Sequence, residues 1–247
     1  MPKIYIIIYS LYGHILTLAH SVKKGLESQG VEVKLFQVSE TLPDSVLAKM
    51  HAPPKADIPV ISVDKLSEAD GFIFGIPTRF GTMPEQFKTF FDATGQLWST
   101  GALTGKFAGI FTSTASQHGG QETTIMTTIT YLVHQGMLYV PLGYANSNLF
   151  DVNIVNGGSP YGAGTITGGD GSRLPSEEEL SVARTQGENF AKLVNAFHKG
   201  KTILEATKTE TETETETKPK PTTAARAIIE EGEIPQRKGI WRLLCCV

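Results

Sequence analysis

The sequence predicts a doubly wound α/β domain built around a parallel β-sheet. Residues 4–9 form an unbroken apolar run rich in β-branched side chains, and residues 16–29 carry apolar side chains at helical spacing. Strand-like runs follow at 31–38 and 71–76. Because the segments between these strands are long enough to hold helices, we expect the strands to pair in parallel.

The second half of the domain continues this alternation. The helix predicted last opens with the capping-box pattern Ser176 to Glu179 and closes the domain near Gly200. The remaining predicted elements are a helix over 85–94, a strand over 107–112, a helix over 121–134, a strand over 137–142 and the closing helix over 176–198.

Composition excludes several functional classes. The 247 residues fit one large domain or one domain with an appendage, and the net charge of -3 gives no sign of nucleic-acid binding. We find no apolar run near the roughly 18 residues of a membrane helix and no signal-peptide pattern, so we expect a cytosolic protein. The two cysteines stand at the C-terminus and the six histidines form no ligand pair, so we expect no metal site.

The turn between the first strand and the first helix is the first candidate site. Ser10 to Gly13 ends a strand and opens a helix, which brings free N–H groups, a hydroxyl and the positive end of a helix dipole to one point. This arrangement suits a phosphate. The alternative is an ordinary β–α connection with a serine cap. Neither the dinucleotide fingerprint nor the nucleotide P-loop pattern occurs here.

Two further polar loops are expected beside this turn. Residues 77–84 follow the third strand and residues 113–120 follow the fourth, and in an open parallel sheet ligands collect outside the carboxyl ends of the strands. Residues 146–172 contain seven glycines. A glycine-rich excursion of that length is expected to pack over a site or over a partner chain.

The chain changes character after the closing helix. We predict a folded domain over 1–200 and a disordered tail over 201–247, because the alternating Thr and Glu residues of 209–217 offer little apolar surface. Acidic and basic residues balance in this tail, and its last ten residues become apolar again.

Several motifs together resemble one family. The resemblance covers about residues 2–199 and is to the WrbA-type NAD(P)H:quinone oxidoreductases of the flavodoxin superfamily, with a tail similar to that of its fungal branch. The motifs are Ser10-x-Tyr12-Gly13-His14, Pro77-Thr78-Arg79-Phe80-Gly81, Gly95-x-Leu97-Trp98, Gly101-Ala102-Leu103, His134-x-Gly136-Met137, Gly157-Gly158-Ser159-Pro160-Tyr161-Gly162-Ala163 and Gly168-Gly169-Asp170-Gly171-Ser172-Arg173.

The resemblance implies a flavodoxin-like three-layer sandwich with five parallel strands in the order 2-1-3-4-5. FMN would lie at the carboxyl edge between strands one and three, and the enzyme would pass two electrons from NAD(P)H to a quinone by a ping-pong mechanism. By this resemblance Tyr12, Trp98 and His134 are the catalytic candidates. The implied FMN-binding residues are Ser10, Leu11, Tyr12, Gly13, His14, Ile15, Thr78, Arg79, Phe80, Ser113, Thr114, Ala115, Ser116, Gln117, His118, Gly119 and His134.

Each side chain also has a structural interpretation. Taken alone, His134 would be a helix-capping or core histidine, Trp98 and Phe80 would be core aromatics, and Arg79 would be a surface cation. The loop after the fourth strand differs from the family pattern, because it is one residue longer and Ala115 replaces a glycine expected at positive φ. A second interpretation is therefore a flavodoxin-fold, membrane-peripheral assembly or stress-related protein with weak or lost FMN binding.

Two expectations concern partners. We expect a homo-oligomer, a tetramer by the resemblance, in which residues 146–172 and the loop around Trp98 meet a neighbouring chain; the alternative is a self-packed loop on a monomer. We also expect Cys245 and Cys246 to be S-acylated and to hold the protein on the cytosolic face of the plasma membrane. Prenylation is excluded because Leu244 occupies the position where that signal needs cysteine. The alternative is a solvated tail with two free thiols.

Overall fold

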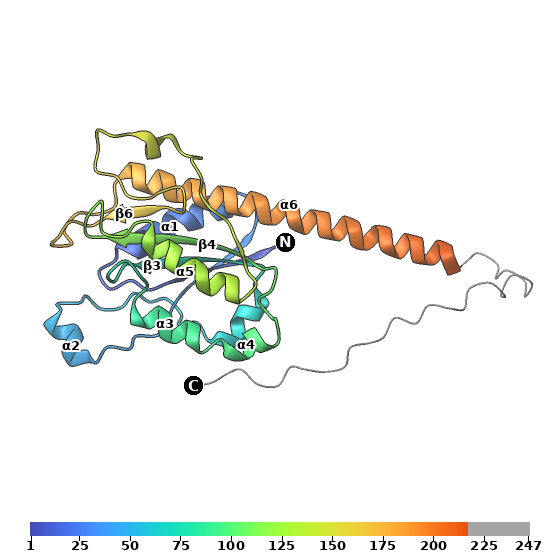
Figure 1. Ribbon diagram of the computed structural model, residues 1–247, viewed down its shortest axis with the longest axis horizontal. Helices are drawn as coiled ribbons and strands as arrows, with labels where there is room; N and C mark the ends of the chain where they lie inside the picture. The colour runs from blue at the N-terminus through green and yellow to red at the C-terminus, as the bar shows by residue number, and fades with distance from the viewer. Residues whose placement is uncertain (217–247) are drawn as a thin grey trace, which may run out of the picture. The chain divides into compact units, whose positions relative to one another are not determined.

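A parallel sheet forms the centre of the domain in the computed structural model, which describes residues 1–216 and their side chains as far as residue 207 (Figure 1). The path of the sheet runs β2-β1-β3-β4-β5, and every pair is parallel. The predicted fold class and strand order are therefore confirmed. The strands on this path are β1 (Lys3–Ile8), β2 (Glu32–Gln37), β3 (Gly71–Pro77), β4 (Phe107–Thr114) and β5 (Leu138–Tyr139).

The fifth strand differs from its prediction. Only Leu138–Tyr139 pair with β4, and a sixth strand, β6 (Gly164–Ile166), pairs with the carboxyl end of β4 at Thr112–Thr114. Because β3 pairs along nearly the whole length of β4, β5 and β6 share its other edge. The chain leaves the sheet after β5, makes the glycine-rich excursion and returns as β6, so the sheet has six strands where we expected five.

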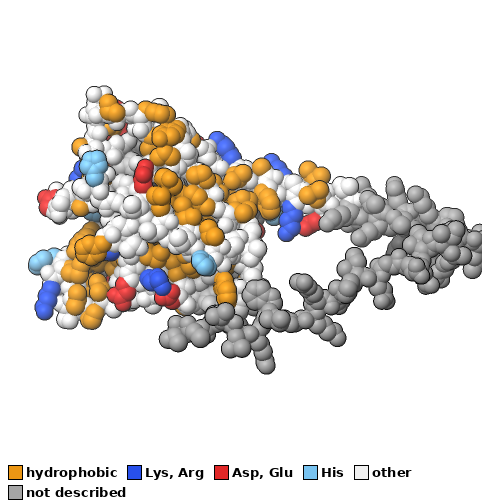
Figure 2. All heavy atoms as spheres, in the orientation of Figure 1, with side chains coloured by type: hydrophobic (Ala, Val, Ile, Leu, Met, Phe, Trp, Pro, Cys, Tyr) orange, Lys and Arg blue, Asp and Glu red, His pale blue; other side chains and the backbone are white. Residues whose placement is uncertain are grey.

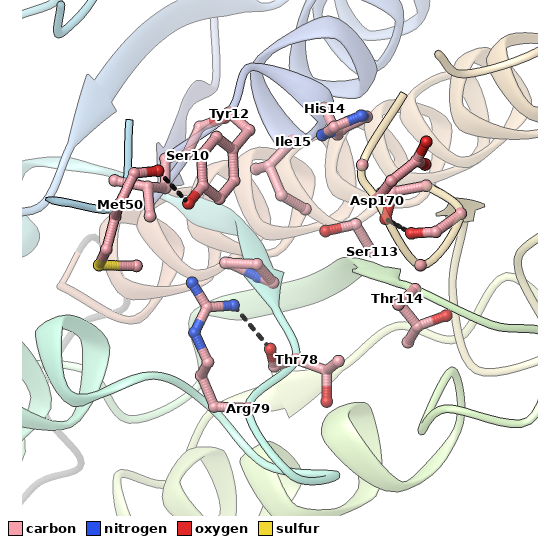
Figure 3. Close-up of a pocket in the computed structure, with 17 residues that line it drawn as sticks. Ser10, Tyr12, His14, Ile15, Met50, Thr78, Arg79, Ser113, Thr114 and Asp170 are labelled. Carbon is pink, nitrogen blue, oxygen red and sulfur yellow. Dashed lines mark hydrogen bonds between the residues drawn. The ribbon is translucent and has the colours of Figure 1, made fainter. Parts of the chain in front are cut away.

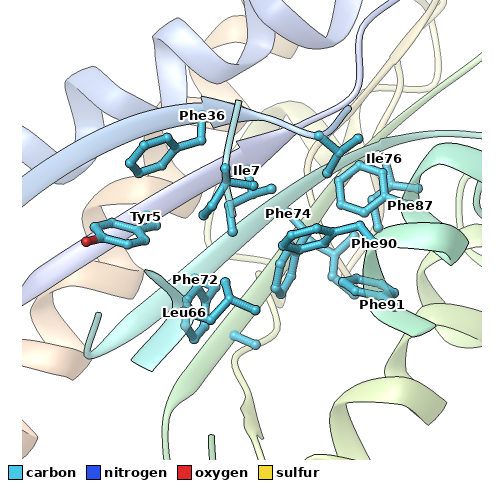
Figure 4. Packing of buried hydrophobic residues seen from close by; sticks show 14 of the residues in the cluster. Tyr5, Ile7, Phe36, Leu66, Phe72, Phe74, Ile76, Phe87, Phe90 and Phe91 are labelled. Atoms are coloured by element: carbon cyan, nitrogen blue, oxygen red, sulfur yellow. The ribbon is translucent and has the colours of Figure 1, made fainter. Parts of the chain in front are cut away.

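Helices cover both faces of the sheet. In β1 the residues Ile4, Ile6 and Ile8 pack with α1 (His14–Glu27) and α6 (Glu177–Glu216). The alternate residues of β1 join an aromatic-rich core with α3 (Glu85–Asp92) and α5 (Thr123–His134), shown in Figure 4. The shorter elements are α2 (Asp44–Lys49), η1 (Val63–Glu68), α4 (Gly95–Ser99) and η2 (Ser147–Phe150).

The closing helix is longer than predicted. It begins at Glu177 as expected but continues to Glu216, so its predicted end near residue 198 is wrong and residues 201–216, predicted to be disordered, are helical. Once a helix is nucleated, each added residue gains a hydrogen bond without needing apolar surface, and glutamate is a good helix former. Residues Met1–Lys201 form one compact unit, and the chain from Thr202 belongs to another.

None of the helices among residues 1–216 is both long and apolar enough to span a membrane. The predicted acylation sites, Cys245 and Cys246, lie outside the described residues, as does the rest of the tail after Glu216.

Candidate functional site

A cavity of about 460 Å³ opens at the carboxyl edge of the sheet, where β1, β3 and β4 end (Figure 3). All three polar loops predicted to converge contribute to it. Its lining residues are Ser10, Leu11, Tyr12, His14, Ile15, Met50, Pro77, Thr78, Arg79, Ser113, Thr114, Ala115, Thr167, Gly168, Gly169, Asp170 and Gly171.

The N-terminus of α1 supplies the first wall of this cavity. Gly13 precedes the helix at φ 89° and, as a glycine, has no side chain to cap the helix end. The Ser10 hydroxyl accepts a hydrogen bond from the N–H of Leu16 at 3.3 Å, inside the first turn. The remaining N–H groups of this turn have no intrahelical acceptor, so they and the helix dipole favour an anion.

His14 adds an unusual feature to this wall. Its side chain is 7% exposed, and its Nε2 has no hydrogen-bond partner among the described residues. A buried polar nitrogen without a partner costs free energy, and here the histidine lines the cavity. An anionic or hydroxyl-bearing ligand would supply the missing partner. The wall therefore fits the phosphate end of a nucleotide-like cofactor.

The loop after β3 forms a fixed second wall. The Thr78 hydroxyl accepts from the N–H of Gly81 at 3.1 Å and lies 2.8 Å from the Thr124 hydroxyl. The Arg79 guanidinium donates to the carbonyl of Thr78 at 2.8 Å. Phe80, by contrast, has a left-handed φ of 54° and a fully exposed side chain, and it does not line the cavity of its own chain.

The loop after β4 is divided between two cavities. Ser113, Thr114 and Ala115 line the first one, whereas Gln117 and His118 line a separate cavity of about 430 Å³ next to the start of α5. Ser116 and Gly119 line neither cavity; the Ser116 carbonyl accepts from the Thr114 hydroxyl at 2.6 Å and from the N–H of Gly119 at 3.1 Å.

The expected strain at Ala115 is absent. Among the described residues, only His51 and Phe80 have a positive φ without being glycine. The prediction that Ala115 occupies a position that demands glycine is therefore wrong, because the longer loop places its left-handed glycine at Gly120, with φ 108°.

A further wall of the cavity was missed by sequence reasoning. Thr167 and the Gly168–Gly171 segment lie across the cavity from the loop after β3, and Met50 lines its mouth, where its carbonyl accepts from the Tyr12 hydroxyl at 3.0 Å. Two signals were available, the glycine content of residues 146–172 and the family motif that begins at Gly168, and the part of that excursion after β6 does pack over the site. Nothing in the sequence around Met50 indicated its position.

Trp98 and His134 do not reach this cavity. His134 is the last residue of α5, which spans about 18 Å at 1.5 Å per residue, and Trp98 lies in α4, after α3. Gly136 lies beside Gly105, just before β4 begins, which places this end of α5 at the amino edge. Gly13, the other predicted residue outside the lining set, borders a small neighbouring cavity under residues 53–58.

A charged cluster supports the ends of β1 and β2 beside the site. Glu40 accepts from the Tyr9 hydroxyl at 3.1 Å and pairs with Lys55 at 2.5 Å, and the Lys55 ammonium lies 4.6 Å from the centre of the Tyr9 ring. Partial burial would raise the pKa of Glu40, but hydrogen bonds from Lys55, Leu42 and Thr41 lower it below its ordinary value. Burial, followed by the charge of Glu40, raises the pKa of Tyr9.

Asp170 places a carboxylate in the wall formed by Thr167–Gly171. Its carboxylate accepts from the N–H and the hydroxyl of Ser172, at 3.1 and 2.9 Å, and these bonds lower the pKa of Asp170. The ionised carboxylate is thus held in an Asx turn at the rim, on the side of the cavity remote from Arg79 (Figure 3).

Comparisons with known proteins agree with this geometry. Residues 2–151 match the family model described as NADPH-dependent FMN reductase. The chain is 61% identical over 191 residues to quinone-oxidoreductase QR2 of Triphysaria versicolor, which covers 76% of this chain and 93% of that protein. It is 53% identical over 196 residues to NAD(P)H quinone oxidoreductase PST2 of Candida albicans, covering 79% and 98%.

A solved structure supports the fold. The flavodoxin, WrbA-like protein from Agrobacterium tumefaciens superposes with a TM-score of 0.55 at 24% identity, covering 79% of this chain and 99% of that one. The likeness agrees with the predicted flavodoxin-like architecture.

Proposed function

The chain belongs to the NADPH-dependent FMN reductase family, and on this premise we propose that it is an FMN-dependent NAD(P)H:quinone oxidoreductase. The two relatives named above carry the quinone oxidoreductase name, at 61% and 53% identity over 93% and 98% of their own length. FMN, when bound, accepts hydride from a nicotinamide and passes two electrons to a quinone, so one flavin face can serve both substrates in alternation.

One observation carries the proposal: an uncapped helix N-terminus, a buried histidine nitrogen without a partner and two rigid loops meet in one cavity. The α1 wall with Ser10 and His14 would hold the phosphate, and Thr78, Arg79 and Ser113 to Ala115 would hold the ring system. Arg79 places a cation at the site, where it would favour a flavin that gains negative charge on reduction. Tyr12 borders the cavity mouth, where a nicotinamide or quinone would enter.

The second interpretation, a flavodoxin-fold protein with weak or lost FMN binding, has less support. The ordinary backbone at Ala115 removes the strain on which that interpretation partly depended. Its remaining support is the tail and the placement of Gln117 and His118 in a separate cavity.

A direct test is to purify the protein, record its visible spectrum and titrate FMN by the quenching of flavin fluorescence. Stopped-flow mixing with NADH or NADPH, followed by a benzoquinone, then separates the two half-reactions. We expect the flavin to bleach with the nicotinamide alone and to recover with the quinone alone, as a ping-pong mechanism requires. Failure to take up FMN, together with no quinone-dependent oxidation of NAD(P)H, would favour the second interpretation.

We further propose that Trp98 and His134 act in a homo-oligomer, as a tetramer in which they approach the cavity of a neighbouring copy. Both side chains are exposed at the edge of the sheet remote from their own cavity. Exposed apolar side chains also occur on α5 and on the excursion, where Tyr144 and Phe150 stack with ring centroids 5.1 Å apart. Figure 2 shows hydrophobic side chains gathered over and beside α5. Sedimentation showing only monomer at micromolar concentration would count against this assembly.

We also propose that the tail anchors the protein to the cytosolic face of the plasma membrane through acylated Cys245 and Cys246. The apolar residues beside them and three nearby basic residues would bring the thiols to a membrane, and two acyl chains give stable attachment where one is marginal. The test is membrane fractionation with hydroxylamine-sensitive acyl labelling. The double variant Cys245→Ser with Cys246→Ser should move the protein to the soluble fraction, whereas unchanged fractionation and no label would refute the anchor.

A further inference from the structure

A fully buried carboxylate lies behind the wall that the sequence did not reveal. Glu179, in the first turn of α6, is 0% exposed, and both of its oxygens accept hydrogen bonds. An ionised carboxylate is costly to bury unless donors surround it, and here they come from several separate segments. The donors other than arginine are the N–H groups of Gly157 at 2.9 Å, Ile166 at 3.0 Å and Ser176 at 2.9 Å, and the hydroxyl of Thr165 at 2.7 Å.

Arg173 completes this arrangement and closes a loop. Its guanidinium pairs with Glu179 at 2.9 Å and donates to the carbonyls of Ile166 at 2.5 Å and Val155 at 2.9 Å. Its own N–H donates to the carbonyl of Thr167 at 2.9 Å. The two ends of the Thr167–Arg173 loop are thereby held together at its base.

The same loop forms the missed wall of the cavity. Its first residue is tied to the site by the bond from the N–H of Thr167 to the carbonyl of Thr114, at 2.8 Å. In the described part of the chain, the hydrogen bonds of residues 168–172 stay inside the loop: Gly168 bonds with Thr167 and Gly171, and Asp170 bonds with Ser172. The position of the wall therefore depends on the clamp at its base.

We propose that Glu179 and Arg173 are positioning residues for the cofactor, which hold the Thr167–Arg173 loop against the cavity without touching the ligand. The identity of that ligand as FMN rests on the proposed function. An arginine suits the role because its planar fork donates to the carboxylate and to two carbonyls at once, which a lysine ammonium cannot do in the same geometry. With the clamp removed, cofactor binding would also have to order the loop.

The test compares Arg173→Ala with a matched core variant, Val194→Ala, at a 2% exposed position further along α6. FMN affinity is measured by fluorescence titration and thermal stability by unfolding. We expect Arg173→Ala to weaken FMN binding by about tenfold or more, because binding must then order the loop. Val194→Ala should lower stability and change the affinity by less than about twofold, because the two sites are separate. Arg173→Lys should fall between wild type and Arg173→Ala, and it replaces the alanine variant if that one does not fold.

A second readout does not need the cofactor. Amide hydrogen exchange in the FMN-free protein should become faster across residues 167–173 in Arg173→Ala and stay unchanged there in Val194→Ala. If wild type binds FMN and Arg173→Ala binds it equally well with unchanged exchange, the positioning role is refuted, and equal losses in both variants refute it as well. If wild type takes up no FMN, the proposed function fails, and the exchange data alone decide whether the clamp orders the loop.

Discussion

Two walls of the same cavity are built in opposite ways. The cradle wall, residues 10–15, is one contiguous turn whose chemistry comes from its own backbone and from the helix that follows it. The loop wall, Thr167–Gly171, is held at its base by the side chains of Arg173, the last residue of the same loop, and Glu179 in α6. The chemistry of the cradle wall can be recognised from a short motif, whereas the place of the loop wall depends on β6 pairing with β4, which is far away in the chain.

The largest expected effect on stability comes from Gly157, a glycine of the excursion that packs against backbone atoms of β6. A Cβ on Gly157 would lie 2.6 Å from the Cα of Thr165 and 2.7 Å from the carbonyl carbon of Gly164, both backbone atoms that cannot move away cheaply. We expect Gly157→Ala to lower the free energy of unfolding by about 3 kcal/mol. Urea denaturation measures this loss.

The control lies within the loop wall itself. Gly169 has no atom within 4 Å of an added Cβ and no positive φ, so Gly169→Ala should stay within about 0.5 kcal/mol of wild type. Equal stability of the two variants would show that the excursion is not packed as closely as its backbone contacts indicate.

A buried glutamine provides the next test. The Gln121 side chain donates to the Thr114 hydroxyl at 2.8 Å and to the carbonyl of Thr165 at 3.0 Å, and it accepts from the N–H of Gly158 at 2.8 Å. Gln121→Ala removes these three hydrogen bonds in a buried site and should cost about 2 kcal/mol of unfolding free energy. It should also weaken FMN binding, because Thr114 lines the cavity.

Thr94 is a matched control for that variant. It is buried, and its hydroxyl contacts the Phe91 carbonyl, the Tyr131 hydroxyl and the Gln135 amide, away from the cavity. Thr94→Val should lower stability with little effect on FMN affinity. If both variants weaken binding equally, Gln121 supports the fold as a whole and not the site in particular.

The cradle wall should tolerate an added methyl group better. Gly13 has φ 89°, but a Cβ added there would meet no atom within 4 Å, so Gly13→Ala introduces only backbone strain, about 1 kcal/mol. Gly30→Ala carries the same kind of strain, at φ 69° with open space, but lies at the far end of α1. We expect similar losses in unfolding midpoint from both and weaker FMN binding from Gly13→Ala alone. A larger stability loss at Gly13 than at Gly157 would show that the cradle wall depends more on close packing than the excursion beneath the loop wall does.

The smallest expected effect is pH-dependent and concerns the cluster beside the cradle wall. Because the folded pKa of Glu40 is lowered, its interactions stabilise the protein above the unfolded pKa and lose this effect as the pH falls through the folded value. The stability difference between wild type and Glu40→Gln should therefore be below about 1 kcal/mol at pH 7 and shrink below about pH 4.3.

Chemical denaturation at several pH values measures this difference. Glu27→Gln, at an exposed ion pair with Lys23, is the control and should change stability less. A difference between wild type and Glu40→Gln that grows toward acid would show that burial of Glu40 outweighs its hydrogen bonds.

The sequence predictions were accurate where a feature depends on residues close together in the chain, and less accurate where it depends on pairing with a distant segment. Apolar runs and helical spacing located the strands β1 to β4 and the helices around them, because burial of one face imposes that periodicity. The prediction for strand 137–142 was too long, because the apolar character of a segment does not show how many of its residues pair. Only Leu138 and Tyr139 pair with β4. The closing helix was predicted too short, because a helix can extend past its last buried turn.

Local sequence was enough to predict the cradle wall at Ser10 to Ile15 and the loop residues Thr78 and Arg79, since each follows a strand that ends at a polar turn. The sheet order came from the family resemblance. Three placements required the folded chain: Phe80 points to solvent, Trp98 and His134 lie at the amino edge, and the Gly168–Gly171 segment joins the cavity. The physical reason is that local patterns encode backbone conformation and burial. The contact of Glu179 with Arg173 is short in sequence, but their loop reaches the cavity only because β6 pairs with the carboxyl end of β4, and no short stretch of sequence records that pairing.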